Sequence, residues 1–203
     1  MSGGAWRAAN PTACFPLAPR PWRWQIVRRR PGAGSIQERS LVSRRLSREA
    51  GHRRKFLAIV DETPECERAI AYAARRSKST SGGVILLFVI EPDEHQHWLG
   101  VEQIMREEAN ATATAALNAH AARIRETIGI EPELVTREGK AAEEIHKLIE
   151  EDQDIAILVL AAGNAKEGPG PLVSSIAGKG AAFPIPVTVV PHSLTDEDIE
   201  SLT

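Results

Sequence analysis

From residue 55 onward, short runs of apolar residues alternate with longer segments of mixed polarity. The runs at 56–60, 84–90 and 155–162 consist entirely of apolar residues, which is typical of strands buried on both faces of a sheet. A more polar run at 133–136 and a run at 186–191 that is bracketed by prolines predict two further strands. The hydrophobic pattern therefore predicts five strands.

The segments between these runs have helical spacing. Thr63 followed by Pro64 predicts the start of a helix, with the Thr63 hydroxyl as its N-cap. Further helices are expected at about 101–127, from about 140, and at about 173–182. Strict alternation of strands and helices predicts an α/β fold with a parallel, doubly wound, Rossmann-like sheet.

The first part of the chain lacks this periodicity and differs in charge. Residues 1–54 contain twelve arginines, no lysine and two glutamates, so they carry about +10, whereas the whole chain carries −2. Prolines and glycines recur too often for a continuous helix, although one short helix near 36–50 is compatible with the pattern. We expect a disordered arginine-rich tail over 1–53, a domain over 54–195 and a short C-terminal tail over 196–203.

Several roles fit the arginine-rich tail. Arginines interleaved with Trp22 and Trp24 could bind nucleic acid or an anionic membrane. An arginine-rich, acid-poor N-terminus also fits an organellar transit peptide. The remaining possibility is an inert segment, or one that is not translated, although the next methionine is Met105, inside the domain. The domain itself is acidic, which argues against nucleic-acid binding by the fold.

Two further features bound the class of protein. The longest apolar run, at 155–162, is too short to span a bilayer. Cys14 and Cys66 lie one in the tail and one in the domain, which fits neither a disulfide framework nor a zinc site. We therefore expect unpaired thiols and a cytoplasmic protein.

Four segments together resemble the universal stress protein family. They are Asp61 directly after the first strand, and the stretches 86–92, 139–145 and 183–191. The resemblance covers about 56–191 and implies an adenine-nucleotide-alpha-hydrolase-like sheet. It also implies a homodimer through the last strand, between Val187 and Val190, and a nucleotide crevice between strands one and four. A ligand is expected at the same place from the fold alone, because strand order reverses there.

The resemblance also assigns binding residues for ATP or another adenine nucleotide. In nucleotide-binding members, an acid after strand one accepts hydrogen bonds from adenosine, and Asp61 occupies that position. A valine of strand two lies near the adenine, and Val89 matches it. The alternative for Asp61 is a turn residue that caps the next helix.

The family's phosphate loop is a glycine, two residues, a second glycine, nine residues, a third glycine and then a serine or threonine. Here the second glycine is Gly163 and the hydroxyl residue is Ser174, with Ser175 beside it. Leu160 and Val173 stand at the first and third glycine positions. A β-branched residue resists positive φ, so Val173 argues against phosphate binding in the family's usual mode.

The sequence contains only part of the residues that a phosphoacceptor, metal or catalytic site would need. Asp61 and Glu62 resemble the acid pair of a response-regulator receiver, but Pro191-His192 stands where a lysine would follow strand five. Glu94, His95 and His97 lack a further ligand cluster at metal spacing, so we expect a solvated loop and no metal site. We find no nucleophile–base pair and expect no catalytic residues.

We therefore expect a non-catalytic stress-response module with a nucleotide or anion crevice. One alternative is a dimeric interaction module without nucleotide. Another is an enzyme that acts on an adenylate, as a hydrolase or ligase.

Overall fold

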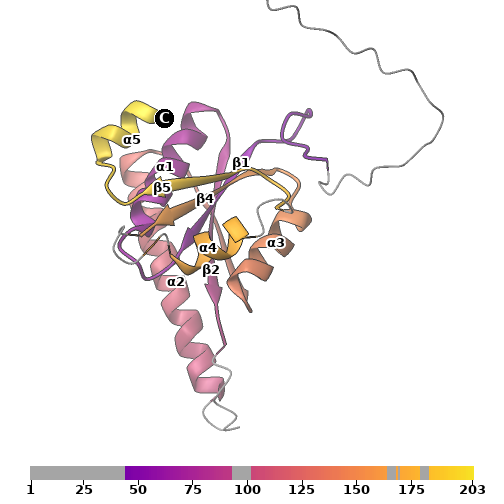
Figure 1. Ribbon diagram of the computed structural model, residues 1–203, viewed down its shortest axis with the longest axis vertical. Helices are drawn as coiled ribbons and strands as arrows, with labels where there is room; N and C mark the ends of the chain where they lie inside the picture. The colour runs from indigo at the N-terminus through magenta and orange to yellow at the C-terminus, as the bar shows by residue number, and fades with distance from the viewer. Residues whose placement is uncertain (1–43, 93–101, 164–167, 169, 179–182) are drawn as a thin grey trace, which may run out of the picture. The chain divides into compact units, whose positions relative to one another are not determined.

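The structure, a computed structural model, describes residues 44–92, 102–163, 168, 170–178 and 183–203. All five strands lie in one parallel sheet with the order β3-β2-β1-β4-β5. Figure 1 labels β1, β2, β4 and β5 of this sheet. The predicted fold class is confirmed. The strands are β1 (Lys55–Val60), β2 (Gly83–Ile90), β3 (Glu133–Glu138), β4 (Ile155–Ala162) and β5 (Val187–Pro191).

The four predicted helices cover the two faces of the sheet. α1 and α2 pack on one face, whereas α3 and α4 pack on the other. A fifth helix, α5, follows the last strand. The helices are α1 (Cys66–Ser79), α2 (Glu102–Thr127), α3 (Ala141–Glu151), α4 (Pro171–Gly178) and α5 (Asp196–Leu202).

β1 shows why the strands consist of unbroken apolar residues. Phe56 and Ala58 belong to the core beneath α1 and α2, whereas Leu57 and Ile59 belong to the core beneath α3 and α4. Successive side chains of a strand point to opposite faces, so a strand in the middle of a three-layer fold needs apolar residues at every position. β1 is such a strand because it pairs with both β2 and β4.

The start of α1 differs from the prediction. The helix begins at Cys66, and its N-cap position is Glu65, whose side chain makes no capping hydrogen bond. The hydroxyl of Thr63 instead donates to Oδ1 of Asp61 at 2.5 Å. A short acidic side chain two residues earlier offers a stronger acceptor, and the competing local hydrogen bond replaces the N-cap with a turn.

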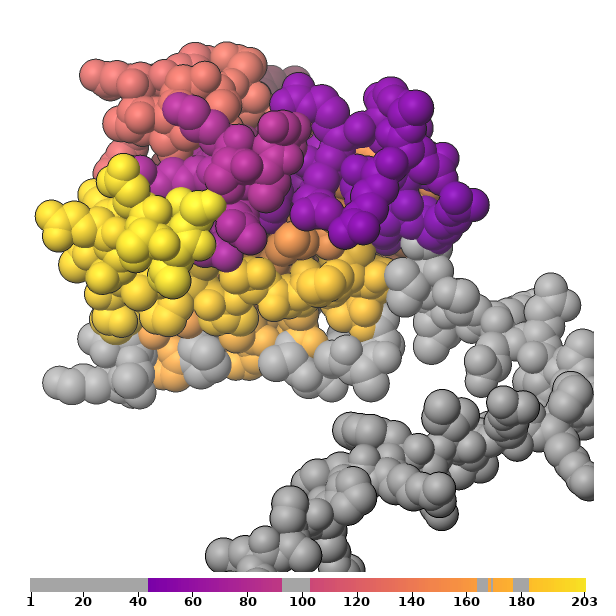
Figure 2. All heavy atoms as spheres, turned by 90° about the horizontal axis from the view of Figure 1, so that it is seen from above, coloured from indigo at the N-terminus to yellow at the C-terminus, as the bar shows by residue number. Residues whose placement is uncertain are grey.

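Residues 196–203 form a helix and not the expected short tail. Thr195 and Asp198 make a capping box at the start of α5, and Ile199 is fully buried. Figure 2 shows α5 in yellow against α1 in magenta. Arg68 of α1 pairs with Asp196 across this contact. Seven residues give too short a periodic pattern for a sequence-based prediction, so tertiary packing stabilises this helix.

Residues 44–54 contact the domain at the amino end of the sheet. The backbone N–H of Leu46 donates to the carbonyl of Gln153 at 3.1 Å. Nδ1 of His52 lies 2.8 Å from Oδ1 of Asp154, and Arg45 donates to the carbonyl of Ile149 in α3. The last ten residues of the predicted tail are therefore attached to the fold. The rest of the tail, with Cys14, Trp22 and Trp24, lies outside the described residues.

Candidate functional site

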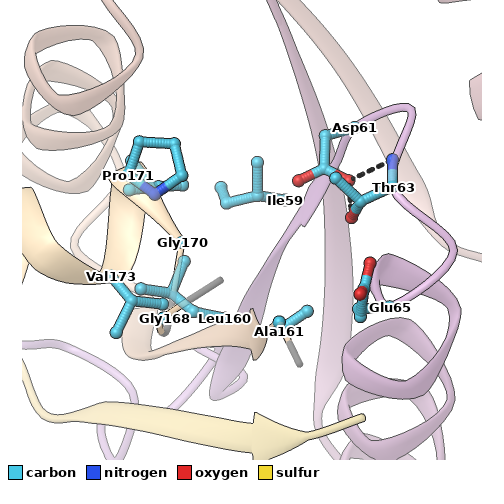
Figure 3. A pocket seen from close by; sticks show the side chains of 12 residues that line it. Ile59, Asp61, Thr63, Glu65, Leu160, Ala161, Gly168, Gly170, Pro171 and Val173 are labelled. Carbon is cyan, nitrogen blue, oxygen red and sulfur yellow. Dashed lines mark hydrogen bonds between the residues drawn. The ribbon is translucent and has the colours of Figure 1, made fainter. Parts of the chain in front are cut away.

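A cavity opens at the carboxyl ends of the neighbouring strands β1 and β4. From β1 the chain adds β2 and β3 on one side, whereas β4 and β5 lie on the other side, so the strand order reverses here. The cavity has a volume of about 300 Å³. Such a switch point is where open α/β sheets bind their ligands. Figure 3 shows its two walls, which come from the β1–α1 turn and from the start of α4. The lining residues are Ile59, Asp61, Thr63, Glu65, Leu160, Ala161, Gly163, Gly168, Gly170, Pro171, Leu172 and Val173. We call this cavity the crevice.

Asp61 is held in position by its own turn. Its Oδ1 atom accepts hydrogen bonds from the backbone N–H of Thr63, at 2.9 Å, and from the Thr63 hydroxyl. Both bonds use the same oxygen, so Oδ2 keeps its accepting capacity for a ligand. The Asp61 carboxylate points into the open space between the two walls (Figure 3). Asp61 is therefore a turn residue and a candidate ligand contact, but it does not cap α1, whose N-cap position is Glu65.

Glu65 provides a second carboxylate on the same wall. It is half-buried and makes no side-chain hydrogen bond or ion pair with any part of the chain that the structure describes. Its Oε1 atom lies 4.0 Å from the position that a Cβ atom would occupy on Gly163. The carbonyl oxygen of Gly168 lies 3.3 Å from that same position. The space beside Gly163 is thus bordered by acceptor oxygens.

The start of α4 forms the opposite wall. Pro171 has no N–H group, and the N–H of Ser174 already donates to the carbonyl of Gly170 at 3.0 Å. Leu172 and Val173 face the crevice, whereas Ser174 and Ser175 are exposed and are not among its lining residues. Helical geometry explains the difference, because successive residues point about 100° apart around the axis.

Of the residues proposed for binding, the structure brings Asp61 and Gly163 into the crevice. Val89 is not among the lining residues, because β2 lies one strand away from the switch point. Val89 packs instead against the core beneath α3 and α4. Leu160 and Val173, which replace glycines of the family's loop, both line the crevice.

Sequence reasoning did not identify Glu65, Thr63 or Ile59 as residues of this site. The only signal for Glu65 was its place four residues after Asp61, within the turn that leads from β1 to α1. This turn places Thr63 and Glu65 beside Asp61 at the carboxyl end of the sheet, but hydrophobic periodicity does not reveal this arrangement.

A second hollow of about 300 Å³ lies beside β5 and shares Leu160 and Val173 with the crevice. Its lining is almost entirely apolar, with Ile176 and Phe183 opposite Val187 and Val189. Among the described strands β5 pairs with β4 alone, and Val189 is 43% exposed. Within the described sheet, β5 is therefore an edge strand and carries an apolar surface. We call this hollow the β5 groove.

The described residues hold no group of three or more histidine, cysteine, aspartate or glutamate side chains placed to bind a metal ion. Glu94, His95 and His97 lie outside the described residues. None of the described helices is long and apolar enough to cross a membrane.

Comparison with known proteins identifies the family of the chain. The model of the universal stress protein family matches residues 52–191, which include the whole sheet and both walls of the crevice. The chain belongs to the universal stress protein family. A search of curated proteins found no match.

Solved universal stress proteins share the fold. UspA from Lactobacillus plantarum is 17% identical with a TM-score of 0.57, over 68% of this chain and 97% of that one. A universal stress protein in complex with cAMP is 16% identical with a TM-score of 0.52, over 69% and 98% of the two chains. The protein from Archaeoglobus fulgidus in complex with dAMP is 16% identical with a TM-score of 0.51, over 68% and 97%.

Proposed function

We propose that this universal stress protein binds an adenine nucleoside or nucleotide in the crevice and acts through that binding, without turnover. The observation that carries the proposal is the Asp61 carboxylate, fixed by Thr63 and aimed into a cavity at the switch point of the sheet. Two universal stress proteins of the same fold bind adenine nucleotides, cAMP in one and dAMP in the other. The cytoplasmic location expected from the two cysteines stays a prediction.

The chemistry of the described lining supports binding more than catalysis. Its side chains are apolar except for Asp61, Glu65 and Thr63. A carboxylate that accepts hydrogen bonds can anchor a ribose or an adenine amino group. The one side-chain hydroxyl among the described lining residues, that of Thr63, donates to Asp61 and holds that carboxylate in its turn. No histidine, lysine or cysteine, the usual partners in acyl or phosphoryl chemistry, occurs among these residues.

Calorimetric titration of the full chain with adenosine, AMP and ATP tests the proposal. We expect Asp61→Asn to weaken the binding of adenine ligands by about tenfold or more, because a hydrogen bond to a charged acceptor becomes one to a neutral acceptor. Glu62→Gln is the matched control, since Glu62 is exposed and does not line the crevice.

The absence of binding by all three ligands at millimolar concentration would contradict the proposal and favour the interaction module. Equal binding by Asp61→Asn and the wild type would contradict the role of Asp61. Conversion of bound ATP to products at a rate that depends on the crevice would contradict the non-catalytic role.

We also propose a homodimer in which β5, between Val187 and Val190, lies against β5 of a second copy. In the part of the chain that the structure describes, β5 pairs with β4 alone and exposes Val189, and such a sheet edge is a template for pairing. The apolar β5 groove adds surface that a partner strand would cover.

Sedimentation equilibrium tests the dimer. Val189→Asp should dissociate it, because a desolvated charge at the interface is costly. Leu134→Asp is the control, since Leu134 is 37% exposed on β3 at the opposite edge of the sheet. A wild-type monomer at high concentration, or a dimer that both substitutions leave unchanged, would contradict the proposal.

A further inference from the structure

We infer that Glu65 makes the crevice select adenine ligands by their charge, so that it binds adenosine more tightly than AMP and AMP more tightly than ATP. This inference rests on the proposed adenine site and assigns its specificity. Glu65 lies on the crevice wall beside Gly163, the residue that the family resemblance puts at the second glycine position of the phosphate loop.

The charge of the site carries the inference. Two carboxylates, Asp61 and Glu65, line the crevice, and no lysine, arginine or histidine does so among the described lining residues. The Glu65 carboxylate forms no ion pair with the part of the chain that the structure describes, so no described cation offsets its charge. An anionic phosphate placed against Gly163 would meet this carboxylate and the carbonyl oxygen of Gly168.

A hydroxyl group meets the same atoms favourably. Carboxylate and carbonyl oxygens only accept hydrogen bonds, and a ribose hydroxyl can donate one whereas a phosphate oxygen cannot. The position beside Gly163 therefore suits a neutral donor. A cavity of about 300 Å³ is also at the lower end of the range for ligand pockets, roughly 300–1,000 Å³, which suits a nucleoside.

The start of α4 offers a competing attraction for anions. Its first turn faces the crevice through Leu172 and Val173. A helix N-terminus strengthens anion binding by roughly two- to fivefold. A like charge at about 5 Å in a partly solvated site weakens binding by roughly tenfold or more. The carboxylate therefore outweighs the helix, and Val173 further hinders the close approach of phosphate to the α4 backbone.

The test compares the affinities of the full chain for adenosine, AMP and ATP in EDTA, so that no divalent cation neutralises the phosphates. We expect adenosine to bind at least tenfold more tightly than ATP, with AMP between them. Glu65→Gln removes the charge at nearly constant shape. It should reduce the ratio of the adenosine affinity to the ATP affinity by about tenfold, mainly because ATP binds more tightly. Glu62→Gln makes the same change of charge three residues away, outside the crevice lining, and should leave the ratio nearly unchanged.

A second measurement keeps the inference testable if Glu65→Gln does not fold. Raising the salt concentration of the wild type from 0.05 to 0.5 M should improve ATP binding relative to adenosine, because salt screens repulsion between like charges. The inference would be overturned if the wild-type protein bound ATP as tightly as adenosine. It would also be overturned if neither Glu65→Gln nor salt changed the ratio of the adenosine affinity to the ATP affinity. Those results leave the adenine site intact, whereas the absence of binding by every ligand would overturn the proposed function instead.

Discussion

Sγ of Cys66 lies 4.0 Å from Nε2 of His120, and the two side chains join the start of α1 to the middle of α2. Cys66 is only 2% exposed, and His120 is half-buried. The Cys66 thiol also donates a weak hydrogen bond to the carbonyl of Asp61 at 3.3 Å. This contact links the turn that holds the crevice carboxylate to the helical layer.

Cys66 should react slowly with thiol reagents. Burial raises the pKa of its thiol to about 11, so little thiolate exists at neutral pH. We expect alkylation by iodoacetamide at pH 8 to be at least tenfold slower in the folded protein than in the urea-unfolded protein, as measured by peptide mass spectrometry. Free glutathione in the same reaction reports reagent activity. Equal rates for Cys66 in the two states would contradict the burial of the thiol.

His120 should make the protein less stable in mild acid. Burial, the largest influence, lowers the pKa of its imidazole below the ordinary value of 6.5. The unfolded state therefore binds more protons below pH 6.5, and the free energy of unfolding should fall as the pH falls through this region. Urea titrations at pH 7.5 and pH 5.5 measure the change.

The asparagine side chain of His120→Asn cannot be protonated, so this variant should lose less stability than the wild type between these two pH values. His146→Asn is the control, because His146 lies on the surface of α3 beside Glu150. If His120→Asn and the wild type lost equal stability, His120 would not be the group responsible.

Gly82 should not tolerate a side chain. A Cβ atom at this position would lie 2.5 Å from the backbone carbonyl oxygen of Arg54, which cannot move without disturbing the start of β1. We expect Gly82→Ala to lower the free energy of unfolding by about 1–3 kcal/mol. Gly83→Ala is the matched control, since its new Cβ would meet the flexible side chain of Lys55 at an ordinary 3.6 Å. Chemical unfolding should separate the two variants, and equal stabilities would show that the backbone at Arg54 can shift.

α5 should contribute to the stability of the domain. Ile199 is fully buried, so Ile199→Ala should cost about 2–4 kcal/mol through lost burial and a cavity. Leu202→Ala on the same helix should cost less than about 0.5 kcal/mol, because Leu202 is 55% exposed. Thermal and urea unfolding of the two variants measure the difference. Equal losses would indicate that α5 is not packed on α1 as the structure describes.

Some residues of the crevice could be predicted from the sequence because they directly follow a strand along the chain. Asp61 directly follows an apolar run, and in a parallel sheet the residue after each strand lies at the same edge. Gly163 follows the β4 run in the same way. Val89 was placed near the ligand by resemblance alone, and the strand order puts it one strand away.

The amino-acid sequence by itself determined the five strands, the four helices α1–α4 and the parallel order of the sheet, but not α5. Unbroken apolar runs require cover on both faces, and alternation with helices leaves the doubly wound sheet as the solution. Tertiary structure alone decided which side chains meet. It turned Thr63 toward Asp61, placed Glu65 beside Gly163 and buried Ile199 of α5. These contacts depend on helix rotation and on long-range packing, which hydrophobic periodicity does not encode.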